Sequence, residues 1–223
     1  MLRTKFNIEI ESLKNNIIEL FNLTMKQHKE VIKALEEESI SKYKIIVAND
    51  NNINKFYAEI LYSAIWRIAK QQPVASDLHH IIGYMSIVKE LERISDYARN
   101  IDNFYLKDKP PVKYSKYIGQ LSKKVLKIMQ FIIKVLADET QWGKKIIKTI
   151  IRLDDIVDSE YNDINTLLID LVLDNVTEDK IWIYIGIMQQ LKYLERSGDH
   201  LVNITETLLL FISQRTHYVD RLQ

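Results

Sequence analysis

One pattern of eleven residues occurs twice in this chain, 103 positions apart. Residues 91–101 read L-E-R-x-x-D-x-x-x-N-I, and residues 194–204 read the same. A second pattern, D-x-x-[IV]-[ND]-x-x-Y-x-x-I, begins at Asp50 and again at Asp154. The chain therefore contains two copies of one unit, and its fold has to give both copies equivalent surroundings.

Composition and periodicity predict that both copies are helical. The 223 residues include only five Gly and three Pro, which leaves long stretches without helix breakers. Apolar residues return every three or four positions along nearly the whole chain, as they do on the buried face of an amphipathic helix. Breaks in this periodicity fall near residues 38–39, 71–73, 107–111, 140–143 and 175–177. We therefore predict an all-α fold of six long helices.

Prolines and a capping residue indicate where helices begin and how they are grouped. Pro73 suits the first turn of a helix, and Thr177 is a suitable cap followed by two acidic residues. We expect the third and sixth helices to begin there. The Pro110-Pro111 pair disfavours helix just before it and marks a boundary. We predict two pseudo-symmetric three-helix bundles, residues 1–108 and residues 109–223, packed as one unit.

The acidic and amide residues of the two patterns are spaced to share one face of their helices. Positions i, i+4 and i+8 lie near the same face, so each copy lines up a Glu, an Asp and an Asn. In an antiparallel helix pair, residues equally far from the connecting turn lie at the same height, and both patterns meet this condition. We predict that they converge once in each half. The candidate metal ligands are Asp50, Asn54, Glu92, Asp96 and Asn100 in the first copy, and Asp154, Asp158, Glu195, Asp199 and Asn203 in the second.

Carboxylate and amide oxygens in such a cluster can hold a hard cation. Oxygen ligands select Mg²⁺, Ca²⁺ or Mn²⁺, and a carboxylate-rich cluster also suits iron or zinc, so the ion is divalent or trivalent. The first copy offers three acids and the second four, and we expect the second copy to bind metal more tightly. The alternative is an internal salt-bridge network, in which Arg93 and Arg196 neutralise the glutamates that they follow.

The histidines add little support for a metal site. His200 follows Asp199 and is a candidate accessory ligand, whereas the other four histidines have no repeated counterpart and suit surface or packing positions. Ferritin-like di-iron proteins use Glu-x-x-His pairs, and no Glu in this chain has a His three residues later. A ferritin-like protein is therefore disfavoured.

Several other classes of function are disfavoured by what the sequence lacks. It has no Cys, which excludes disulfides and thiolate chemistry and suits the cytoplasm. It has no phosphate-binding glycine loop, nucleophile elbow or zinc-protease motif, so we expect no enzymatic activity. The net charge of +1 argues against nucleic-acid binding. Residues 107–148 hold eleven Lys and three acids, which we interpret as a solvated face, with docking to an acidic protein or anionic lipid as the alternative.

Taken together, these patterns resemble the PhoU family, the accessory proteins of bacterial phosphate-specific transport. The resemblance covers nearly the whole chain and includes the doubled three-helix layout. Two departures from the family pattern are Ser95, where the family favours the Gly kept at Gly198, and His79, where an Arg is usual. The segments that carry the resemblance are residues 50–54, 71–78, 91–96 and 194–200.

The resemblance implies regulation and not catalysis. Similar proteins hold metal clusters in their Glu/Asp-x-x-x-Asp motifs in some cases, and they often form homodimers. They repress the phosphate-starvation response by engaging the phosphate transporter's ATPase subunit and a sensor histidine kinase at the inner face of the membrane. We expect this chain to act likewise, as a peripheral protein at most. A carboxylate-rich metal-storage protein and a metal-free structural adaptor are the competing interpretations.

Overall fold

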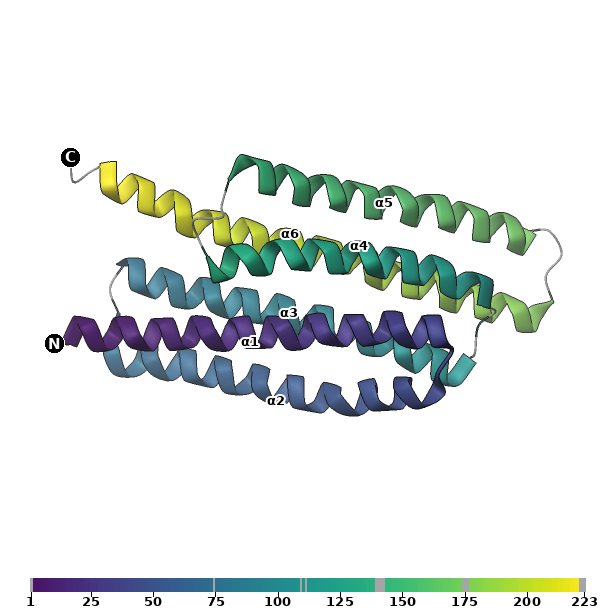
Figure 1. Cartoon of the computed structure of the whole chain (residues 1–223), viewed down its shortest axis with the longest axis horizontal. Helices are drawn as coiled ribbons and strands as arrows, with labels where there is room; N and C mark the ends of the chain where they lie inside the picture. Colours follow the sequence, from purple (N-terminus) through teal and green to yellow (C-terminus); the bar gives the residue numbers. More distant parts are fainter. Residues whose placement is uncertain are drawn as a thin grey trace.

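The described part of the chain folds into six long α-helices (Figure 1). The computed structural model describes residues 2–73, 75–108, 110, 112–138, 143–173 and 177–220. These residues contain no strand, which confirms the all-α prediction. The helices are α1 (Leu2–Glu37), α2 (Ile40–Gln71), α3 (Ala75–Asp108), α4 (Val112–Ala137), α5 (Lys144–Leu173) and α6 (Glu178–Asp220).

The first two helices end where the periodicity predicted breaks. Glu38 and Gln72, which directly follow α1 and α2, have left-handed backbone with φ of 52° and 47°. The Gln72 N–H donates to the carbonyl of Ile68 at 3.1 Å and so closes the last turn of α2. Two other predicted breaks lie mostly outside the described residues, namely those at 140–143 and 175–177. Pro111 also lies outside them.

The predicted starts of the third and sixth helices differ in accuracy. α6 begins at Glu178, directly after Thr177, whose carbonyl accepts from the N–H of Lys180 at 2.9 Å, as predicted. α3 begins at Ala75, so Pro73 precedes the helix and the prediction that it forms the first turn is wrong.

The two halves of the chain pack together along α3 and α6. α1, α2 and α3 contact one another, α4 contacts both α5 and α6, and α5 contacts α6; α3 packs on α6, and α1 on α4. Gly83 on α3 faces the ring of Phe211, and Gly186 on α6 faces the ring of Phe104; a Cβ at these glycines would lie 2.4 Å and 2.3 Å from the rings. These reciprocal contacts hold an antiparallel pair close at both ends. The predicted division after residue 108 stays a prediction, because Lys109 lies outside the described residues.

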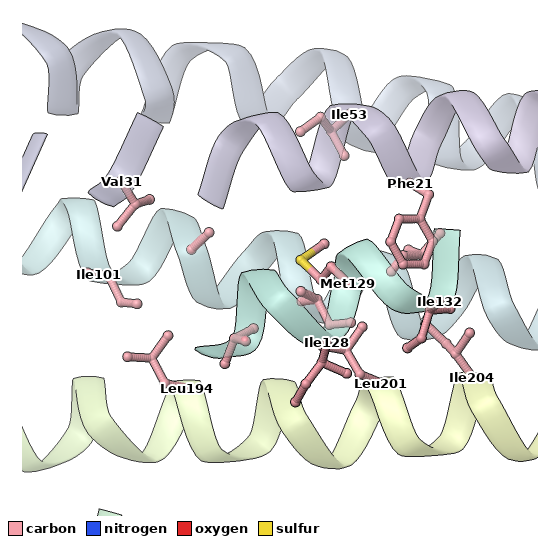
Figure 2. Close-up of a cluster of buried hydrophobic side chains, with 14 of the residues drawn as sticks. Phe21, Val31, Ile53, Ile101, Ile128, Met129, Ile132, Leu194, Leu201 and Ile204 are labelled. Atoms are coloured by element: carbon pink, nitrogen blue, oxygen red, sulfur yellow. The ribbon is translucent and has the colours of Figure 1, made fainter. Parts of the chain in front are cut away.

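One apolar core runs through all six helices. On α4, Leu121, Val125, Ile128 and Ile132 follow one another at spacings of three and four and are at most 1% exposed. Figure 2 shows side chains of α1, α3, α4 and α6 reaching into this shared interior. Across the part of the chain that the structure describes, no helix is long and apolar enough to span a membrane.

One carboxyl group is buried in this core without a partner. Asp102 on α3 is 0% exposed, and neither of its oxygens has a hydrogen-bond partner. It lies near Tyr43, whose ring stacks on that of Tyr105 with centroids 5.4 Å apart. Burial raises the pKa of Asp102 from 3.8 to about 9, so the folded protein holds this side chain protonated at neutral pH.

Asp102→Asn should stabilise the protein increasingly as the pH rises. The unfolded chain releases the Asp102 proton above its pKa of 3.8, whereas the folded chain keeps it until about pH 9. The folded state of the wild type therefore loses about 1.4 kcal/mol of stability per pH unit between these limits, and the neutral Asn loses none. Urea denaturation at several pH values between about 5 and 8 measures the difference. Asp108→Asn, an exposed change on the same helix, is the control; a stability gap independent of pH would contradict the prediction.

Candidate functional site

The four acids of the second copy converge between α5 and α6. Asp154 and Asp158 on α5 lie within electrostatic range of Glu195 and Asp199 on α6. The helices approach closely because Gly198 has no side chain, and a Cβ there would lie 2.3 Å from Oδ1 of Asp154. The structure thus brings together the four carboxylates that the repeated patterns predicted.

The surroundings of this acidic cluster are unfavourable to negative charge. One oxygen each of Asp154, Asp158 and Glu195 is buried without a hydrogen-bond partner. Burial, and then the charges of Asp158 and Asp199, raise the pKa of Asp154 to about 7. Burial and the charge of Glu195 also raise the pKa of Asp158 and of Asp199. The cluster therefore carries more negative charge than its surroundings offset.

Lys192 offsets part of this charge, and His200 and Arg196 also act on Asp199 in the same direction. The ammonium group of Lys192 lies 2.5 Å from Oε1 of Glu195 and 5.2 Å from the ring centroid of Tyr161. The hydrogen bond to Glu195 raises the pKa of Lys192, which keeps the lysine charged. No Lys or Arg among the described residues forms an ion pair with the three aspartates of the cluster.

The first copy also brings its acids together, but it surrounds them with hydrogen-bond donors. Asp50 on α2 is 1% exposed. Its Oδ2 accepts from Nη1 of Arg99 at 2.8 Å and from Nδ2 of Asn54 at 3.0 Å. Its Oδ1 accepts from Nε2 of Gln27 at 3.3 Å and lies 3.2 Å from Oγ of Ser95. Both oxygens of this buried carboxylate are therefore hydrogen-bonded.

Arg99 joins the acids of the two helices in the first copy. Besides Asp50, its Nη1 contacts Oδ1 of Asp96 on its own helix at 2.9 Å. Burial and the charge of Asp96 raise the pKa of the neighbouring Glu92, while Arg93 acts in the opposite direction. The salt-bridge network that the sequence offered as an alternative is present here, but Arg99 forms it. Arg93 and its counterpart Arg196 are exposed.

The predicted amide ligands and His200 are not placed as metal ligands beside the acids of their copies. Asn54 donates a hydrogen bond to Asp50 instead. Asn203 donates to Oε2 of Glu90 on α3 at 3.2 Å. His200 pairs with the same Glu90 at 2.5 Å, so it ties α6 to α3 in this arrangement and is not directed at the acidic cluster. In the described part of the chain, Asn100 makes no hydrogen bond to the acids of its copy.

The donor sets of the two copies suit a metal ion differently. As they stand, no three His, Asp or Glu side chains within the described ranges are arranged to hold a metal ion. The second copy nevertheless fits a hard cation, because it offers several buried carboxylate oxygens without partners and an excess of negative charge. The first copy fits one less well, because Asp50 and Asp96 already share a guanidinium group.

Comparison with known proteins identifies the family. Residues 17–103 and residues 118–208 each match the family model described as the PhoU domain, so one domain contains each copy of the repeated patterns. The chain belongs to the PhoU family. This confirms the resemblance inferred from the repeated patterns.

Individual PhoU relatives match over most of their length. The chain is 27% identical over 214 residues to the phosphate-specific transport system accessory protein PhoU homolog of Clostridium acetobutylicum, covering 96% of each chain. It is 29% identical over 170 residues to the Aquifex aeolicus homolog, covering 75% of each. The crystal structure of PhoU from Pseudomonas aeruginosa superposes with a TM-score of 0.81 at 25% identity, covering 94% of this chain and 99% of that one.

Arg99→Val should destabilise the metal-free protein, because Asp50 would stay buried after losing its charged partner. Removing one member of a buried ion pair costs about 3 kcal/mol. Arg93→Val removes an exposed arginine of the same helix and should cost less than about 1 kcal/mol. Urea denaturation in the presence of a chelator compares the two variants. Equal losses would show that Arg99 is not the main partner of Asp50.

Proposed function

We propose that the protein is a cytoplasmic negative regulator of phosphate uptake and of the phosphate-starvation response, controlled by a metal ion bound between α5 and α6. The acidic cluster with its unpartnered oxygens carries the metal part of this proposal. Membership of the PhoU family supports the phosphate part, because relatives are named accessory proteins of phosphate-specific transport.

The four acids of the second copy would hold the ion. It would supply the positive charge that the cluster lacks and would relieve the repulsion between α5 and α6. Asp154 and Asp158 would then be tied to Glu195 and Asp199, which links two neighbouring helices through one ion. Because both helices form part of the protein's outer surface, their relative position would depend on the metal.

The same two helices carry a surface that suits a protein partner. Ile169 and Leu173 near the end of α5, and Trp182 and Ile185 near the start of α6, are 47 to 75% exposed. Exposed apolar side chains in such numbers at one end of a helix pair favour contact with another protein. We propose the phosphate transporter's ATPase subunit and a sensor histidine kinase as the partners, engaged by a homodimer at the inner face of the membrane.

Metal storage and metal-free adaptor function remain the competing proposals, and metal content separates them. Protein purified without chelator should contain at least one and at most a few metal ions per chain. The double variant Asp154→Asn, Asp158→Asn should lose them, because it removes two anionic ligands. Asp163→Asn, an exposed change on the same helix, should not. Elemental analysis by mass spectrometry is the measurement. Many ions per chain would favour storage, and a trace amount would favour the adaptor.

Deleting the protein should raise the expression of phosphate-starvation genes in phosphate-rich medium. The wild-type chain and Asp163→Asn should restore repression, and the double variant Asp154→Asn, Asp158→Asn should not, because the partner surface would no longer respond to metal. Reporter expression and co-purification of the ATPase and the kinase are the measurements. If the wild-type chain captured neither partner at high or low phosphate, the regulatory proposal would fail.

A further inference from the structure

Three of the four donors that surround Asp50 in the first copy have no counterparts around Asp154 in the second. Superimposing the repeated patterns pairs each of these three donors with a residue of the second copy, while the fourth donor, Gln27 on α1, lies outside the patterns. In every pair the second residue is an acid, a glycine or an apolar residue, so no side-chain donor remains. The equivalent positions are Asn54 and Asp158, Ser95 and Gly198, and Arg99 and Val202.

Arg99 makes the largest electrostatic difference between the copies. Its guanidinium group is charged at any physiological pH, and one of its nitrogens lies 2.8 Å from Asp50 and 2.9 Å from Asp96. It therefore bridges a carboxylate of α2 and a carboxylate of α3, which is the contact that a metal ion would make between the acids of two helices. In the second copy, Val202 leaves this place without a cation.

We infer that the Arg99 guanidinium takes the place of a metal ion in the first copy, so that this chain takes up metal only at the second copy. The inference rests on the proposed metal dependence of the protein. It goes beyond a difference in affinity between two metal sites, because Arg99 already bridges Asp50 and Asp96 in the first copy, whereas among the described residues no Lys or Arg forms an ion pair with the aspartates of the second.

A metal ion at the first copy would have to compete with a cation that is part of the chain. It would need oxygens of Asp50 and Asp96, which Arg99 already occupies. A tethered group has a high effective concentration, and a displaced guanidinium would still repel an incoming cation from nearby. Asn54 and Gln27 would also lose their hydrogen bonds to Asp50, which is itself buried. Metal uptake is therefore opposed at each step.

Lys192 does not play the part of Arg99 in the second copy. Its ammonium group contacts Glu195, which lies three residues further along the same helix, and it makes no ion pair across to α5. Asp154 and Asp158 keep buried oxygens without partners. In the first half, side chains of the protein itself link α2 to α3. In the second half, a metal ion would link α5 to α6.

Exchanging the two residues between the copies tests the inference directly. Arg99→Val should create a second metal site and raise the metal content per chain about twofold, because it exposes Asp50 and Asp96 to the ion. Val202→Arg should lower the content to background, because it supplies a cation to Asp154 and Asp199. Val202→Gln, a long side chain without charge, is the matched control and should keep the wild-type content. Equilibrium dialysis against Mn²⁺, and then Mg²⁺, Zn²⁺ and Fe²⁺, followed by elemental analysis, gives these values.

Thermal unfolding supplies a second measurement that does not require Arg99→Val to be stable. Without metal, Val202→Arg should unfold at a higher temperature than the wild type, because the added charge relieves the repulsion within the acidic cluster. It should gain nothing further from metal. Val202→Gln should unfold at or below the wild-type temperature and be stabilised by metal. A Val202→Arg protein that still binds and responds to metal like the wild type would overturn the inference.

Single changes of the paired aspartates separate failure of this inference from failure of the proposed function. If Asp154→Asn lowers the metal content to background and Asp50→Asn leaves it unchanged, the inference is supported. If Asp50→Asn lowers the content as much as Asp154→Asn does, metal binds at both copies and only the inference fails. If the wild type takes up none of the four ions, the proposed metal dependence fails and the inference fails with it.

Discussion

Like charges held together inside packed helices are the constraint on which both halves of this protein depend. A buried carboxylate is costly unless it is paired or hydrogen-bonded. The first half meets this cost with its own donors, and Arg99 bridges Asp50 and Asp96. In the second half the cost persists, as the raised pKa of Asp154 and the unpartnered oxygen of Glu195 indicate. Equivalent helix pairs therefore carry two different electrostatic arrangements.

The repulsion in the second half cannot be relieved by moving the helices freely apart. α6 is held against α3 by the reciprocal contacts of Gly83 with Phe211 and of Gly186 with Phe104, and its apolar face belongs to the shared core. α5 has fewer neighbours, since it contacts only α4 and α6 among the described elements. The strain of the acidic cluster therefore falls mainly on α5, the less enclosed of the two helices that carry the cluster.

The sequence predicted the helices and the meeting of the acids because both depend on regular helix geometry. Spacing fixes the face on which a residue lies, and distance from a turn fixes its height. Three features of the structure could not be predicted in this way, because they depend on contacts between particular side chains. Arg99 lies outside the shared pattern, and it is found only by asking where the two copies differ. Asn203 turns toward Glu90 on α3, a third helix that a two-helix argument leaves out. Asp102 is buried without a hydrogen-bond partner, and the residues next to it in the sequence do not show which side chains of other helices surround it.

A regulator needs one part that changes with its signal and another that does not. A ligand shifts a conformational equilibrium only as far as it binds the two states differently. A pair of helices already closed by an internal cation offers a metal ion little such difference, whereas a pair with uncompensated carboxylates offers much. The asymmetry between Arg99 and Val202 would confine the response to α5 and α6, which also carry exposed Leu173 and Trp182. The first half packs against α6 through α3 and would keep its position while α5 moves.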